Sequence, residues 1–101
     1  MQNKGMFFGN LVEDPVLRNI AGNSVTTLRI AVNTTKKETL FVDITFWDKK
    51  AEMLCEYFTK GRKIGVEYYV KNKVGKINAQ EFGTYEFVGT DFLFLDKKEN
   101  E

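Results

Sequence analysis

The chain has 101 residues, of which 43% are hydrophobic and 14% aromatic, and its formal net charge is +1 at pH 7. This length suits one folded domain with its own core, and the composition excludes a disordered chain. The near-neutral charge argues against a strongly basic nucleic-acid-binding protein, and no segment approaches the roughly 20 apolar residues that cross a membrane.

Three strands are predicted in the first half of the chain, from the alternation of apolar and polar residues. They cover residues 4–12, 25–33 and 40–49, and turn signals separate the first two. The polar segment 34–39 is predicted to be a short connection between the second and third strands.

The third predicted strand, with the sequence LFVDITFWDK, raises the question of function. Its alternation directs four side chains toward the core: Leu40, Val42, Ile44 and Phe46. Phe41 and Trp47 fall on the opposite face, where a half-buried strand ordinarily carries polar residues. We therefore expect a ligand, a partner or another part of the fold to cover these two rings.

A change of period from 2 to 3.6 predicts one helix after the third strand. The apolar residues there follow the spacing i, i+3, i+4 and i+7, and they are Ala51, Leu54, Cys55 and Phe58. Asp48 is predicted to be the N-cap and Lys60 to lie in the last turn. Gly61 is expected to adopt the left-handed conformation that ends the helix.

Residues 63–73 and 84–95 are predicted to form the last two strands, with Gly89 at a bulge in the second of them. The segment 74–83 between them is predicted to be a hairpin connection. One domain is therefore expected over residues 1–96, followed by a short solvated tail over residues 97–101.

This order of elements indicates the fold class. Three strands, a short helix between the third and fourth strands, and two final strands match the mainly all-β OB-fold, a five-stranded Greek-key barrel. The alternative architecture is another small α+β sheet with one helix packed across it.

The absence of histidine and the single cysteine restrict the chemistry. Catalytic triads and histidine metal ligands are excluded, and Cys55 on an apolar helix face lacks an imidazole partner. One cysteine cannot form an internal disulfide, and the start of the chain lacks the apolar run of a signal peptide. We therefore expect a cytoplasmic protein that is not an enzyme and holds no metal or other cofactor.

Aromatic rings beside cations are the combination that holds an unpaired nucleic-acid strand, because bases stack on the rings while lysine and arginine contact the phosphates. Phe41 and Trp47 lie six residues apart on one strand face, roughly 20 Å, which accommodates several nucleotides. The predicted binding residues are Phe41, Trp47, Thr45, Arg29, Tyr69, Lys71, Lys73, Lys36, Lys37, Lys76 and Phe82. For the aromatic members the alternative role is a core or subunit contact.

Asp43 shares the face of Phe41 and Trp47, and its charge would repel a phosphate. We expect it to pair across the sheet with a cation such as Arg29 and to orient that guanidinium.

Four segments resemble, in order, the bacterial single-stranded DNA-binding protein family. They are GNLVEDPVLR (9–18), LRIAVN (28–33), FVDITFWDKKAE (41–52) and EYFTKGRKIGVE (56–67), within a resemblance that covers residues 4–95. The resemblance implies an OB-fold that coats single-stranded DNA without sequence preference in replication, recombination or repair. Phe41 and Trp47 match family positions where aromatic side chains stack on bases.

The resemblance also implies a homodimer or homotetramer joined through first-strand edges and sheet packing, so Met6, Phe7 and Phe8 are the expected interface residues. The sequence departs from the family in several places. Tyr68 stands where the family commonly has glycine, and whether Phe82 or Tyr85 supplies the aromatic of the 74–83 segment stays open.

The family's acidic C-terminal tail, which recruits replication and repair enzymes, has no counterpart before Glu101. We therefore expect a reduced form without that recruitment, in the nucleoid or in a host cytoplasm, of chromosomal, plasmid or phage origin. The alternative function is an OB-fold primosome or assembly accessory protein whose aromatic face mainly docks a protein partner.

Overall fold

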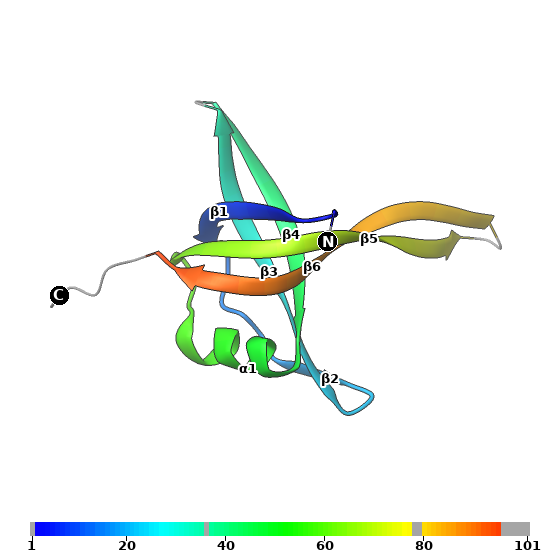
Figure 1. The fold of residues 1–101 in the computed structure, drawn as a ribbon, viewed down its shortest axis with the longest axis horizontal. Coiled ribbons are helices and arrows are strands. Elements are labelled where there is room, and N and C mark those ends of the chain that lie inside the picture. Colours follow the sequence, from blue (N-terminus) through cyan, green and yellow to red (C-terminus); the bar gives the residue numbers. More distant parts are fainter. Residues whose placement is uncertain (1, 36, 78–79, 96–101) are drawn as a thin grey trace, which may run out of the picture.

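The computed structural model describes residues 2–35, 37–77 and 80–95, whose strands form a closed barrel with one helix at its end (Figure 1). The elements in chain order are β1 (Gly5–Leu11), β2 (Arg18–Ile20), β3 (Asn23–Thr35), β4 (Glu38–Trp47), α1 (Asp48–Tyr57), β5 (Lys63–Ile77) and β6 (Gln80–Phe94). The strand order is β1-β5-β6-β4-β3-β2, and β1 also pairs with β3 to close the barrel. The predicted OB-fold, with a helix between the third and fourth barrel strands, is confirmed.

The strand β2 was not predicted, because three residues are too few to show an alternation. It pairs with the start of β3 at the edge of the sheet and takes no part in closing the barrel. Five strands therefore make up the barrel within the described residues, as expected for the fold.

Two hairpins extend beyond the barrel, and we call them the β3–β4 arm and the β5–β6 arm. In Figure 1 the first rises above the barrel and the second reaches out to one side. The predictions of connections over 34–39 and 74–83 are wrong for most of those residues, because β3 runs to Thr35, β4 starts at Glu38, β5 runs to Ile77 and β6 starts at Gln80. Paired strands outside a barrel have no buried face, so their sequences lack the apolar alternation that marks a strand.

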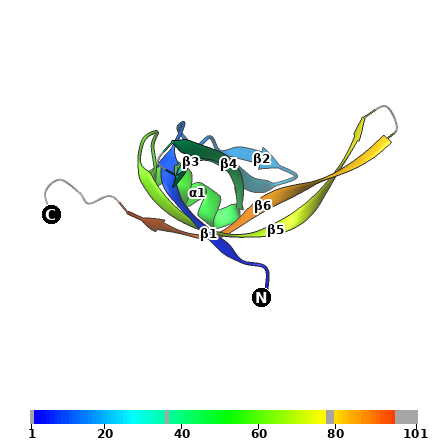
Figure 2. The ribbon, with the colours of Figure 1, turned by 90° about the horizontal axis from the view of Figure 1, so that it is seen from above.

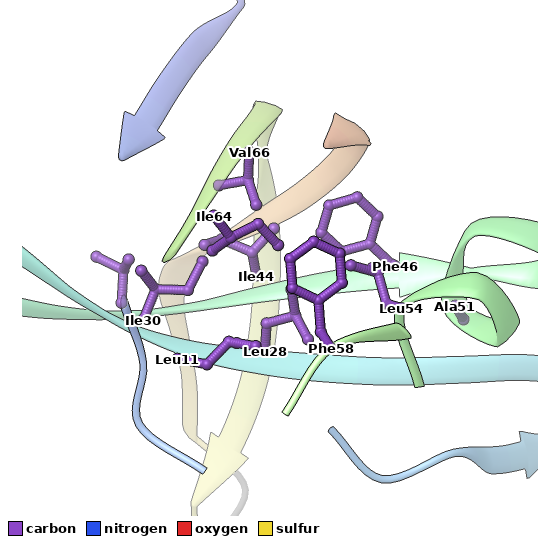
Figure 3. Packing of buried hydrophobic residues seen from close by; sticks show 11 residues of the cluster. Leu11, Leu28, Ile30, Ile44, Phe46, Ala51, Leu54, Phe58, Ile64 and Val66 are labelled. Carbon is purple, nitrogen blue, oxygen red and sulfur yellow. The ribbon is translucent and has the colours of Figure 1, made fainter. Parts of the chain in front are cut away.

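The core lies inside the barrel and is sealed by α1, which is seen through the ring of strands in Figure 2. Side chains from β3, β4 and β5 meet there, as Figure 3 shows for Leu28, Ile44, Phe46 and Ile64. The inward direction predicted for the alternating residues of β4 is confirmed for Val42, Ile44 and Phe46. Leu40 is the exception, with 41% of its surface exposed, because this part of β4 belongs to the arm.

The helix α1 packs its apolar face, including Ala51 and Leu54, against this core, while Cys55 is half-buried. The prediction of Asp48 as N-cap is wrong: Trp47 holds that position without a side-chain hydrogen bond, and Asp48 is the first helical residue, with a φ of 58°. Aspartate tolerates this left-handed conformation better than most residues, which permits the abrupt turn from strand to helix.

The C-terminal end of α1 also differs from the prediction. The helix ends at Tyr57, and its C-cap Phe58 donates its backbone N–H to the Leu54 carbonyl oxygen, so Lys60 lies outside the last turn. Gly61 has the expected left-handed φ, 89°, but in the turn that follows the helix. The Lys50 ammonium near the start of α1 pairs with Asp91 of β6 at 3.2 Å, and the Phe92 N–H together with Lys50 holds the pKa of Asp91 below its usual range.

Two glycines leave room for bulky rings on neighbouring strands. Gly89 lies at a register shift where β6 has one more residue than β5, as predicted, and a Cβ at this position would overlap the Phe46 ring. A Cβ on Gly5 would lie 2.5 Å from the Tyr68 hydroxyl oxygen. The Tyr68 ring therefore fits because the residue opposite has no side chain, and it stacks on Phe7 with 4.5 Å between centroids.

The helices of the described residues include none with the length and apolar character needed to cross a membrane.

Candidate nucleic-acid interface

A groove of about 530 Å³ lies between β4 and the β5–β6 arm. The open edge of β4 forms one wall, because in the described part of the chain β4 pairs with β6 only through Ile44 and Thr45. The lining residues come from all five barrel strands: Phe7, Thr27, Leu40, Phe41, Val42, Asp43, Thr45, Lys73, Tyr85, Glu86 and Phe87. The groove thus combines aromatic rings, hydroxyl groups and charges of both signs.

The outer face of β4 presents the two rings that the sequence singled out. Phe41 lines the groove with 52% of its surface exposed. Trp47 ends β4 with 39% exposed, opposite the buried Val25 of β3, and it lies beyond the groove lining. Neither ring is a core residue of the chain, so both can meet a ligand or a partner.

Arg29 and Asp43 form the cross-strand pair expected between β3 and β4. They are directly opposite in the ladder, and Arg29 Nη1 donates to Asp43 Oδ1 at 3.3 Å. The same guanidinium lies over the Phe41 ring, with 5.5 Å from Cζ to the centroid. A cation, an acid and an exposed ring are therefore joined on one face.

A second polar row crosses the same face, and sequence reasoning did not select its first member. Arg18 of β2 donates from Nη2 to Thr27 Oγ1 at 3.3 Å, and Thr27 Oγ1 lies 3.5 Å from Thr45 Oγ1. Thr45 thus lies on the predicted face and lines the groove. The three residues of β2 are too few to show an alternation that would place Arg18 on this face. Only the family-like segment at residues 9–18 includes it.

The β5–β6 arm supplies the other side of the groove. Lys73 lines it, while Lys71 pairs with Glu86 at 3.6 Å, and Tyr69 is half-buried. Glu86 was not predicted, because the residue opposite Lys71 is known only once the hairpin register is known. The positive charge of this arm is therefore partly neutralised.

Tyr85 is one of the two aromatic residues between which the sequence leaves the choice open. It lines the groove and exposes 72% of its surface. Lys37 is exposed near the tip of the β3–β4 arm. Lys36 and the side chains of Lys76 and Phe82 lie outside the part of the chain that the structure describes.

The groove side chains offer aromatic rings for stacking and polar groups for hydrogen bonding. Across residues 2–35, 37–77 and 80–95, no group of three His, Cys, Asp or Glu side chains is placed to hold a metal ion. The Cys55 thiol lies on α1, outside the groove lining.

The expected interface residues lie on β1, on alternate faces. Met6 and Phe8 are exposed on the outer face, where Phe8 is in register with Gly65, and Gly65 with Leu93. Phe7 points to the other face, where its ring stacks on Tyr68. Within the described residues, β1 pairs along one edge with β5 and along the other only through Asn10 and Leu11 with β3.

Comparisons with known proteins agree with the fold. The model of the single-strand binding protein family matches residues 2–92. Single-stranded DNA-binding protein 2 of Listeria monocytogenes is 32% identical over 108 aligned positions, which cover 99% of this chain and 68% of that protein. A single-stranded DNA-binding protein of Clostridium perfringens is 33% identical, and the alignment covers 93% of this chain and 66% of that protein. Single-stranded DNA-binding protein 2 of Staphylococcus aureus strain COL is 31% identical, and the alignment covers 99% of this chain and 78% of that protein. The chain belongs to the single-strand binding protein family.

Proposed function

We propose that this protein binds and coats single-stranded DNA without sequence specificity, and that the outer face of β4 and the adjoining groove form the binding site. The proposal is carried by Phe41, a large apolar ring that stays half exposed on the groove wall. Every base offers an apolar face for stacking, so such a ring binds bases without selecting a sequence.

Bases stack on Phe41 and Trp47, and Tyr85 offers a further ring from the opposite side of the groove. Arg29, Lys71 and Lys73 contact phosphates along the strand, with Lys37 on the β3–β4 arm, while Thr45 contributes a hydroxyl group. Tyr69 lies on the same strand face as Lys71 and Lys73. The family and the names of the relatives support the choice of ligand.

The protein acts in this proposal by binding alone, with no catalytic step and no cofactor. Its setting is DNA replication, recombination or repair in the cytoplasm. Coating exposed strands protects them and prevents base pairing, which all three processes require.

The protein also assembles into a homodimer or homotetramer in this proposal. Met6 and Phe8 place apolar surface on the outer face of β1, beside Leu93 of β6. The incompletely paired edge of β1 offers backbone groups to a second copy. Phe7 contributes only indirectly, because it packs on Tyr68 within its own chain.

The experiment that tests the proposed site uses Trp47, the single tryptophan of the chain, as reporter. An unlabelled oligothymidine is titrated into the protein at several salt concentrations while tryptophan fluorescence is recorded. We expect strong quenching, with affinity that falls as salt rises because binding releases counterions from the DNA.

Absence of both quenching and a gel shift would overturn the proposed function and leave the aromatic face to a protein partner. Binding without quenching would remove Trp47 from the site while keeping the function. Quenching insensitive to salt would contradict the phosphate contacts assigned to the cations.

A further inference from the structure

We infer that Asp43 is a positioning residue for DNA binding, which holds the Arg29 guanidinium beside Phe41 so that one nucleotide meets a ring and a phosphate donor already in place. This inference rests on the proposed function and adds a role for an acidic residue within a site for a polyanion. It predicts that removal of a negative charge weakens the binding of DNA, the opposite of the usual effect on a polyanion.

The geometry ties the three side chains together. Arg29 lies opposite Asp43 in the ladder, and both carboxylate oxygens lie near the same nitrogen, Nη1, at 3.3 and 3.5 Å. Phe41 precedes Asp43 by two residues, so it is the diagonal neighbour of Arg29 and within reach of its long side chain. The guanidinium lies over the ring at 5.5 Å, held from one side by the acid and from below by the ring.

This arrangement leaves useful groups free for a ligand. The guanidinium has five N–H donors in a planar fork, and the bond to Asp43 uses one nitrogen. Its remaining donors can meet a phosphate, and the Phe41 face away from Arg29 can receive a base. A planar, weakly hydrated guanidinium suits both contacts, whereas an ammonium group at this position would supply only a point charge.

Two opposing effects set the sign of an Asp43 substitution. Without the acid, Arg29 must lose its rotamer freedom when DNA binds, which weakens binding. The acid also repels phosphates, but its side chain is 55% exposed, so the high dielectric of the surrounding water weakens this repulsion. The ordering of Arg29 is therefore the larger effect.

The test measures the dissociation constant for a fluorescently labelled oligothymidine by anisotropy, with the full chain and its variants at physiological salt. Asp43→Asn keeps the shape of the side chain, and we expect it to weaken binding about threefold, the scale of an exposed cation–π contact. Asp43→Glu should restore most of the affinity, because a carboxylate can again reach Arg29.

The decisive arm repeats Asp43→Asn in an Arg29→Met background. There only the repulsion of phosphate remains, so the same substitution should tighten binding. Asp91→Asn is the matched control: it removes the same charge from an ion pair, with Lys50, that lies outside the groove lining, and it should leave the affinity unchanged.

Asp43→Asn that binds DNA as tightly as the wild type, or more tightly, overturns the inference while leaving the proposed function standing. The inference also fails if Asp43→Asn weakens binding equally with and without Arg29, because Asp43 would then act through another group. A wild-type protein that does not bind the oligonucleotide overturns the proposed function and this inference together.

Discussion

Phe41 and Trp47 differ in surroundings although they share one strand face. Phe41 lies on the groove wall with Arg29 over its ring, while Trp47 ends β4 just before the left-handed Asp48 turns the chain into α1. Stacking on either ring needs only a free aromatic face, so we expect both to bind bases.

At the residue scale, Phe41→Ala and Trp47→Ala should each weaken the binding of oligothymidine by about 1 to 3 kcal/mol, the usual contribution of one base–ring stack. Dissociation constants from anisotropy titrations measure the loss. Tyr57→Ala, which removes an equally exposed ring from α1, is the control and should bind as the wild type does.

Both β4 variants should keep the wild-type unfolding temperature, because neither ring belongs to the buried core. A large fall in the unfolding temperature of Trp47→Ala would instead assign that ring a structural role. Unchanged affinity in both variants would move the binding site off β4.

At the scale of elements, the two lysines of the β5–β6 arm contribute unequal charge to the groove. Lys73 lines the groove directly, whereas Lys71 shares its charge with Glu86 on the neighbouring strand. A cation already paired with an internal carboxylate displaces fewer counterions from DNA than one that contacts the phosphate alone.

Lys73→Ala should therefore reduce the slope of log affinity against log salt by roughly 0.7, the value for one phosphate of a single strand, and Lys71→Ala by less. Glu86→Gln should steepen the slope, because it releases Lys71 to contact phosphate. Affinities measured over a salt series test all three variants, with Lys50→Ala as a control outside the groove lining. If Lys71→Ala and Lys73→Ala reduce the salt slope equally, Glu86 does not compete with DNA for Lys71.

The elements also show how far the sequence predicts the fold. The barrel strands and α1 were predicted because one face of each is buried, and alternation or helical spacing reports burial. The arms were missed because both of their faces meet solvent. The role of Asp48 was misjudged because an N-cap and a left-handed first residue favour the same side chains.

The parts of the candidate site that lie on a single strand were predictable from the sequence. The parts that depend on which residues of two strands lie opposite each other were less so. The face shared by Phe41 and Trp47 follows from the alternation within β4 alone. The pairing of Lys71 with Glu86 and the place of Tyr85 depend on the register of the β5–β6 hairpin, which a single sequence does not specify. The pair of Arg29 and Asp43 was expected on electrostatic grounds and is confirmed.

At the scale of the whole molecule, the outer face of β1, β5 and β6 is the proposed meeting surface of subunits. The double substitution Met6→Asp/Phe8→Asp should convert the expected dimer or tetramer to a smaller species, because it places charges on the apolar surface. Light scattering coupled to size-exclusion chromatography measures the mass.

Val16→Asp/Leu17→Asp is the matched control, since these exposed apolar residues lie in the connection between β1 and β2. It should keep the wild-type mass. An assembly that survives the β1 substitutions would place the subunit contact elsewhere, and a wild-type monomer would remove the assembly from the proposal.

The contact between Gly5 and Tyr68 has a consequence for the evolution of the chain. A side chain at position 5 and a large ring at position 68 compete for the same space, because a Cβ on Gly5 would lie 2.5 Å from the tyrosine hydroxyl oxygen. A side chain at position 5 is therefore tolerated only when the ring at position 68 is replaced by a smaller residue or moves aside. Homologues that carry glycine at position 68 have room for a larger residue at position 5. The sizes of the residues at these two positions should therefore be inversely correlated among homologues.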